Sequence, residues 1–103
     1  MSVSARLELD EDRLRVFGNI GPENVLAIRS EGERLIAGHR RDVSVDLSAL
    51  GAAHSVVLSL LLCWLRLARS RHQSLVFCGV GERLESLALL SGLDGHLPGF
   101  HQS

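Results

Sequence analysis

Hydrophobic and polar residues alternate along three short stretches of the chain. These stretches run from Val3 to Leu9, from Leu14 to Gly18 and from Val43 to Leu47. Because successive side chains of a β-strand point to opposite faces, the alternation predicts three strands, each with one buried and one solvated face. A fourth stretch, Leu75 to Cys78, is apolar throughout, which predicts a strand buried on both faces.

Apolar residues recur at helical spacing in the segments between and after these strands. The first helix is expected to start near Pro22, which suits a first turn, and to be closed by Gly38. Gly32 lies in its middle, where glycine costs about 1 kcal/mol relative to alanine. The most apolar helix is expected from Ser55 to Arg71, and a third from Glu82 to Ser91. The residues after it are expected to form a loop-like tail.

The order of these elements predicts an α/β fold. The first two strands form an antiparallel hairpin around the acidic turn at Asp10 to Asp12. A helix then leads to the third strand, and a right-handed crossover makes the second and third strands parallel. We therefore expect one domain over residues 1–103, with a small mixed sheet of four to five strands packed with three or more helices, mainly on one face.

Composition and charge exclude several classes of protein. The chain has 103 residues, 46% of them hydrophobic, and a net charge of -1, which is typical of a globular domain. Eleven basic residues against 12 acidic ones give no excess positive field for nucleic acid. The apolar run from Val56 to Leu65 is shorter than the roughly 20 residues of a membrane span, so no membrane insertion is expected.

The first residues and the two cysteines indicate a cytosolic protein. The N-terminal segment turns acidic at Glu8 and Asp10, unlike a signal peptide. Cys63 and Cys78 lie inside apolar segments rather than in a spaced framework, which favours reduced thiols in the core over a disulfide or a zinc site.

The helix that starts at Ser55 has a mixed stripe opposite its apolar face. At about 100 degrees per residue, one side is formed by Ser55, Ser59, Leu62, Arg66 and Ser70, with Cys63 and Arg69 beside it. The opposite side is formed by Val57, Leu60, Leu61, Trp64 and Ala68. That apolar side is expected to face the core, which leaves Leu62 exposed. Such a stripe suits docking of a protein partner, although single exposed leucines are also common.

Ser55 has three possible roles at the start of this helix. Its hydroxyl can cap a free backbone amide, which we favour on chemistry alone. It can be a phosphorylation site, because a phosphate there would meet the positive end of the helix dipole. It can also be a nucleophile. His54 precedes it, but adjacent residues at a helix start rarely aim their side chains at each other, and no G-x-S-x-G motif is present, so no enzyme is expected.

Metal and cofactor sites are not expected from the sequence. The five histidines have no metal-ligand spacing and are expected on surface loops: His39, His54, His72, His96 and His101. The segment GVGER, Gly79 to Arg83, has two glycines without a following G-K-[ST], so a plain strand-to-helix turn is favoured over a phosphate loop.

The segment VDLSALGAAHSVVLSLLL resembles the signature of the STAS domain family, V-D-[LV]-S-x-L-x-x-x-D-[ST]-x-G-L. Its first half is matched by Val45, Asp46, Leu47, Ser48 and Leu50. Ser55 takes the position of the family's phosphorylatable serine or threonine, and Leu58 that of its leucine. His54 stands where the family usually has aspartate and Val57 where it has glycine. The likeness extends through LVFCGVGERLESLALLSGLDGHLPG and so covers nearly the whole chain.

Within that family, the short length and leucine-rich helix are most similar to the STAS subunits of Mla phospholipid-transport ABC complexes of Gram-negative bacteria. The resemblance implies a non-catalytic cytoplasmic adaptor that binds the ABC-transporter ATPase, and through it the permease complex at the inner membrane, in support of outer-membrane lipid asymmetry. The implied interface is formed by His54, Ser55, Ser59, Leu62 and Arg66. The alternative is a stand-alone anti-sigma factor antagonist controlled by phosphorylation of Ser55, which the substitutions at His54 and Val57 make less favourable.

Overall fold

The strands form one mixed sheet. The structure is a computed structural model that describes residues 5–52 and 54–100. Within them the strands are β1 (Arg6–Asp10), β2 (Arg13–Phe17), β3 (Val43–Asp46) and β4 (Leu75–Cys78), in the order β1-β2-β3-β4. β1 and β2 are antiparallel, and β3 is parallel to both β2 and β4. The predicted hairpin and the predicted parallel crossover are thus confirmed.

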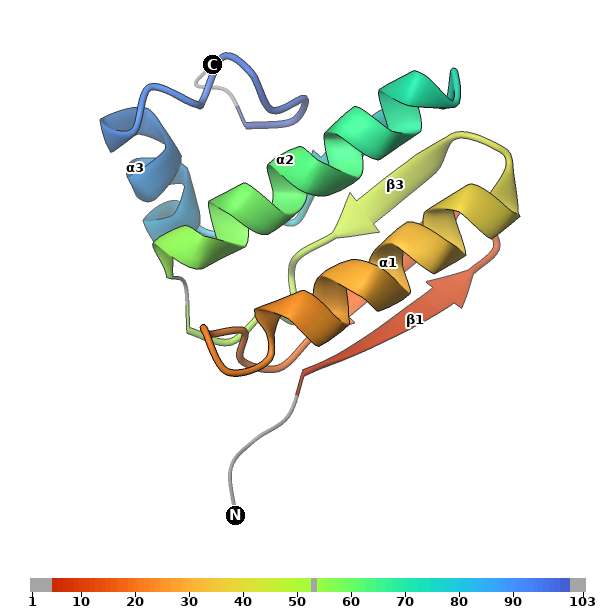
Figure 1. Ribbon diagram of the computed structural model, residues 1–103. Coiled ribbons are helices and arrows are strands. Elements are labelled where there is room, and N and C mark those ends of the chain that lie inside the picture. The colour runs from red at the N-terminus through yellow and green to blue at the C-terminus, as the bar shows by residue number, and fades with distance from the viewer. Residues whose placement is uncertain (1–4, 53, 101–103) are drawn as a thin grey trace.

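Two of the helices cover one face of this sheet. The helices are α1 (Val25–His39), α2 (Ser55–Ser70) and α3 (Glu82–Leu90). Figure 1 shows α1 and α2 side by side in front of the strands, running in the same direction, with α3 beside the first half of α2. The predicted fold class, an α/β arrangement with helices mainly on one face, is confirmed.

The core lies between the sheet and these two helices. It contains alternate strand residues such as Leu14, Val16 and Val45, and the predicted apolar face of α2. The opposite face of the sheet carries exposed arginines, so the first three strands have one wet face, as predicted. The prediction for β4 was wrong, since Val76 is 41% exposed. No described helix covers that face, and the apolar run of β4 therefore does not mean burial on both sides.

Gly32 allows α1 and α2 to approach closely. A Cβ atom on this residue would lie 2.3 Å from the ring of Trp64, which is fully buried. The indole Nε1 of Trp64 donates a hydrogen bond to the backbone oxygen of Arg29, at 3.2 Å. The glycine that weakens α1 locally is therefore what lets the tryptophan pack against it.

Both ends of α1 differ from the sequence prediction. The helix begins at Val25 rather than Pro22, because Asn24 holds the preceding residues in a turn: its Oδ1 accepts from the Gly21 amide at 2.9 Å and its Nδ2 donates to the Asn19 oxygen at 3.0 Å. At the other end the helix continues through Gly38 to His39. The left-handed residue that ends it is Arg40, with φ of 65°.

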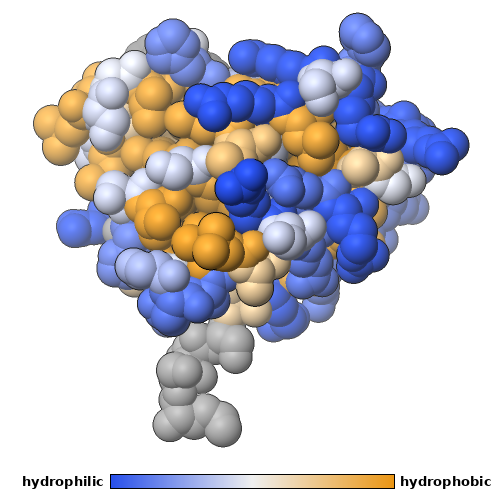
Figure 2. Space-filling model, in the orientation of Figure 1, coloured by the Kyte–Doolittle hydropathy of each residue, from blue (hydrophilic) through white to orange (hydrophobic). Residues whose placement is uncertain are grey.

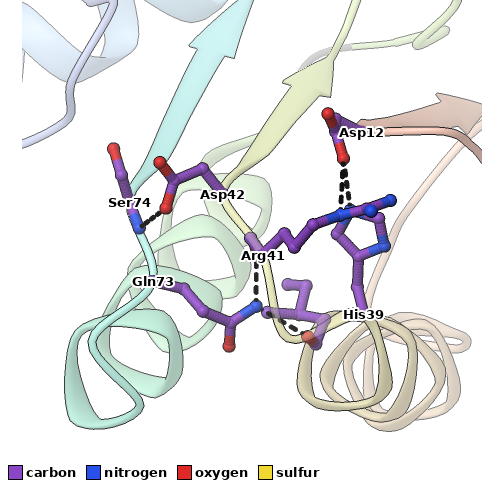
Figure 3. Close-up of polar contacts among 7 residues, drawn as sticks. Asp12, His39, Arg41, Asp42, Gln73 and Ser74 are labelled. Atoms are coloured by element: carbon purple, nitrogen blue, oxygen red, sulfur yellow. Dashed lines mark hydrogen bonds and ion pairs between the residues drawn. The ribbon is translucent and has the colours of Figure 1, made fainter.

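Polar side chains join the last turns of α1 and α2 to the sheet (Figure 3). The buried Gln73 donates from Nε2 to the backbone oxygens of Ile36, at 2.9 Å, and Arg41, at 2.8 Å. Asp12, in the β1–β2 turn, contacts His39 Nε2 at 2.7 Å and Arg41 Nε at 3.3 Å. These bonds fix the right-hand end of the helical layer in Figure 1.

The predicted position of the histidines holds only in part. The side chain of His39 is only 8% exposed, because it ends α1 and packs beside the β1–β2 turn, so the prediction of a surface loop was wrong for this residue. His54, His72 and His96 are exposed. His101 lies outside the described residues.

The segment after α3 completes the core at the outer edge of β4. The amide of Phe77 donates to the oxygen of Pro98 at 2.9 Å. The rings of Phe77 and Phe100 meet edge to face, with centroids 5.6 Å apart. Leu97 and Phe100 are buried. This segment has no helix or strand among its described residues, as predicted for a tail, but it contributes to the core.

Candidate docking site on α2

Asp46 fixes the start of the loop that leads from β3 to α2. Its Oδ1 accepts a hydrogen bond from the Ser48 amide at 3.0 Å, and Arg13 Nη1 lies 3.3 Å from its Oδ2. The amide and hydroxyl of Ser48, and then Arg13, hold the pKa of the Asp46 carboxyl below its usual value. The carboxylate therefore stays charged at neutral pH, which keeps the turn closed.

The β4–α3 turn packs against this turn. Gly79 has a φ of 67°, and a Cβ atom on it would lie 2.8 Å from both Asp46 Oδ1 and the Ser48 nitrogen. Only glycine fits here without displacing these atoms. GVGER is thus a strand-to-helix turn, as predicted, in which Gly81 is the N-cap of α3.

The middle of the loop is held by the end of β2. The Ala52 amide donates to Asn19 Oδ1 at 2.8 Å, and the Gly51 amide donates to the Gly18 oxygen at 2.7 Å. The Gly18 amide donates in turn to the Ala49 oxygen at 3.3 Å. Sequence reasoning missed Asn19, because its partners are 33 positions away and leave no local pattern.

The start of α2 presents His54 and Ser55 to solvent. His54 is the N-cap, in an extended conformation, and its oxygen accepts from the Val57 amide at 3.0 Å. Ser55 is the first helical residue and His54 is the N-cap, so the predicted capping position of Ser55 was wrong. Ser55 itself is exposed.

The mixed stripe of α2 lies mostly on the surface. Ser55, Ser59, Arg66 and Ser70 are exposed. Leu62 is half-buried and packs against the core cluster, so the expectation that it stands exposed was wrong. The residues predicted to face the core are all buried: Val57, Leu60, Leu61, Trp64 and Ala68. Cys63 and Cys78 are free and half-buried rather than fully buried.

Three exposed leucines lie on the helical layer, and the sequence analysis did not single them out. Leu26 near the start of α1 is 70% exposed, and Leu89 and Leu90 at the end of α3 are 55% and 84% exposed. Figure 2 shows apolar surface over α3 and the first turns of α1 and α2, and hydrophilic surface at the opposite end, where α1 and α2 finish. The surface of the helical layer therefore changes from apolar at the start of α2 to hydrophilic at its end.

The sequence offered His54 with Ser55 and the histidines and cysteines as candidates for a catalytic or metal site. Within residues 5–52 and 54–100, no hydrogen bond joins His54 to Ser55, and no group of three or more His, Cys, Asp or Glu side chains is placed to hold a metal ion. In the same part of the chain, no helix has the length and apolar character needed to cross a membrane.

A family of known domains matches nearly the whole chain. A family model described as "Mlab, STAS domain" matches residues 3–99. The chain belongs to this STAS domain family. Among curated proteins, a sequence search finds no match for this STAS domain.

Solved structures with the same fold are anti-sigma factor antagonists. SpoIIAA in its unphosphorylated form has a TM-score of 0.68 and 17% identity, over 87% of this chain and 82% of that one. An anti-sigma factor antagonist from Mycobacterium paratuberculosis has a TM-score of 0.66 and 23% identity, over 98% of this chain and 87% of that one. An anti-sigma-factor antagonist (STAS) domain protein from Planctomyces limnophilus has a TM-score of 0.67 and 17% identity, over 92% of this chain and 87% of that one. These likenesses establish the STAS fold of the chain.

Proposed function

We propose that this STAS domain is a non-catalytic cytoplasmic adaptor that binds the ATPase of a phospholipid-transporting ABC complex. The observation that carries the proposal is the match of residues 3–99 to the family described as Mlab. Through the ATPase the domain is held at the inner membrane, beside the permease, without inserting into the bilayer. Its role is to support assembly and activity of the transporter.

The surface of α2 supports docking as the mode of action. Ser55 and Ser59 are small and exposed, so a partner backbone can approach the helix closely. The accessible part of Leu62 offers apolar contact, and Arg66 offers charge. Asn19 and Asp46 hold Ser48 and Ala52 in the loop that precedes α2, which lowers the entropy that this part of the loop loses on binding.

Binding of the purified domain to the Mla-type ATPase of the same organism tests this proposal. Ser55→Arg places a long charged side chain in the contact and should reduce ATPase capture in a pull-down by about tenfold or more. Ser74→Arg is the matched control, because Ser74 is exposed just before β4, outside α2 and its stripe. Capture of Ser55→Arg at the wild-type level would count against the α2 site, and no capture of the wild type would refute the adaptor role.

The second candidate function is a stand-alone anti-sigma factor antagonist switched by phosphorylation of Ser55. Two observations favour it: two similar solved structures are anti-sigma factor antagonists, and Ser55 is exposed at the N-terminus of α2. A phosphate there would be stabilised by the helix dipole.

Phosphorylation by an anti-sigma factor kinase of the same organism separates the two candidates. Under the second function, ATP and the kinase add one phosphate to the wild type and to Ser59→Ala, and none to Ser55→Ala. Under the adaptor function, the kinase neither binds nor labels the domain. Intact-mass measurement reads out both results.

A further inference from the structure

The mixed stripe of α2, called the docking stripe from here on, contains Arg66 and has Arg69 beside it. Neither arginine has an acidic partner in the described part of the chain. Five arginines form ion pairs with carboxylates: Arg6, Arg13, Arg29, Arg34 and Arg41. Arg66 and Arg69, on the outer side of α2, form none of these pairs and are exposed. Their charges are therefore open to a partner.

The sequence around these arginines contains no acid that could neutralise them. No aspartate or glutamate occurs between Asp46 and Glu82, so α2 and both of its flanking loops lack carboxylates. The acids of α3, Glu82 and Glu85, are in its first turn, and α3 lies beside the first half of α2 (Figure 1). On α1, Glu33 is bonded to Arg29 at 3.1 Å.

The helix end accounts for only part of this charge. Cations near the last turn of a helix are favoured by its dipole, which explains one arginine in that turn. Arg69 is the arginine in that turn, and Arg71 follows as the C-cap residue, with its Nη2 3.5 Å from the Ala37 oxygen of α1. Arg66 lies one turn earlier and shares the outer side of α2 with Leu62 and Arg69, at spacings of four and three residues. It continues the docking stripe instead of capping the helix.

We infer that the partner surface that covers α2 is acidic where it meets Arg66 and Arg69 and apolar where it meets the start of α2. This inference rests on the proposed function and specifies the chemistry of its partner. Arginine is weakly hydrated and matches a carboxylate with two parallel hydrogen bonds, so aspartate and glutamate side chains of the ATPase are the complementary groups. α3, which carries the exposed Leu89 and Leu90, lies beside the first half of α2 (Figure 1).

This polarity fixes the direction in which the partner lies along α2. Turning the partner end for end would place its carboxylates against leucines and its apolar surface against arginines, and both mismatches cost binding free energy. Because the two charges lie at the outer end of the stripe, they are expected to act mainly on the association rate and on its dependence on salt.

The test measures the Kd of the full chain for the purified ATPase at several salt concentrations. For the wild type, Kd should rise between about 50 and about 300 mM KCl, because salt screens exposed charge pairs. The double variant Arg66→Gln/Arg69→Gln should bind about tenfold more weakly at the lower salt and lose most of the salt dependence. Arg6→Gln/Arg15→Gln is the matched control, since it removes two exposed arginines on the opposite face of the sheet and should leave Kd unchanged.

The possible outcomes separate this inference from the proposed function. If the wild type binds and the stripe variant matches the control, the inference is overturned and the adaptor function stands. If the wild type does not bind at any salt concentration, the adaptor function fails, and the inference fails with it. Sedimentation with phosphatidylglycerol–phosphatidylethanolamine vesicles that requires Arg66 and Arg69 would also overturn it, because the arginines would then serve a lipid surface.

Discussion

At the scale of single residues, the role of Gly32 depends on its neighbour across the helix pair. In an isolated helix its replacement by alanine would be favourable by about 1 kcal/mol. Here the added methyl group would meet the buried Trp64 ring at 2.3 Å. The tryptophan is fully buried and hydrogen-bonded to α1, so it has little room to move.

Gly32→Ala is therefore expected to destabilise the protein by about 1–3 kcal/mol, the usual cost of overpacking a core. Gly38→Ala is the control in the same helix, where an added Cβ meets nothing within 4 Å. It should leave stability unchanged or raise it by about 0.5–1 kcal/mol. Urea unfolding measures both free energies, and a stabilising effect of Gly32→Ala would show that Trp64 repacks freely.

The Asp46 carboxylate should make stability depend on pH. Because the fold lowers its pKa, its contribution is complete above the unfolded value of about 3.9 and is lost as the pH falls through the folded pKa. Asp46→Asn should cost about 1.5–3 kcal/mol at pH 7, the usual value of hydrogen bonds to a charged group. The difference from the wild type should shrink with each step below about pH 4.

Urea unfolding across this pH range measures the effect. Asp10→Asn is the control, because Asp10 is exposed in the same sheet and has no hydrogen bond or ion pair among the described side chains. If Asp46→Asn lowers the free energy of unfolding by the same amount at neutral and at acid pH, Asp46 acts through its shape and not through its charge.

At the scale of elements, Gln73 holds the end of α1 against the turn that follows α2. Its single Nε2 group donates to two backbone oxygens: that of Ile36 in the last turn of α1 and that of Arg41 just after the helix. Gln73→Met keeps the length of the side chain and removes both bonds. We expect a loss of about 2–3 kcal/mol, because buried carbonyl groups are left without donors.

Gln73→Glu should be more damaging than Gln73→Met at neutral pH. A carboxylate would face the oxygens of Ile36 and Arg41, and it would be charged in a buried position. Thermal or urea unfolding ranks the three proteins. Equal stability of Gln73→Met and wild type would mean that water replaces the amide group.

At the scale of the whole molecule, one continuous core joins the sheet, α1, α2, α3 and the segment that ends at Phe100. No element can therefore leave without exposing residues of the others. We expect unfolding in urea to be a single cooperative transition, as is usual for domains of this size.

The only tryptophan of the chain, Trp64, gives a direct measurement of this cooperativity. Its fluorescence reports the α1–α2 contact, and far-ultraviolet circular dichroism reports all helices. Both signals should change at the same urea concentration. Separate midpoints would show that the helical layer detaches before the sheet unfolds.

The order of strands and helices and the core side of α2 could be predicted from the sequence. Both follow from local periodicity, because a strand or an amphipathic helix is specified by residues two to four positions apart. The strand hairpin and parallel crossover followed from general rules of chain connection. The family resemblance was also visible in the segment from Val45 to Leu58, and the match over residues 3–99 confirms it.

The tertiary structure alone decided how these elements meet and which side chains remain accessible. It placed His39 beside Asp12, paired Asn19 with the α2 loop, left Val76 exposed and partly buried Leu62. It also moved the cap of α2 from Ser55 to His54. Each of these outcomes depends on contacts between residues far apart in the chain or on which face of the sheet the helices cover. Local periodicity carries no information about either.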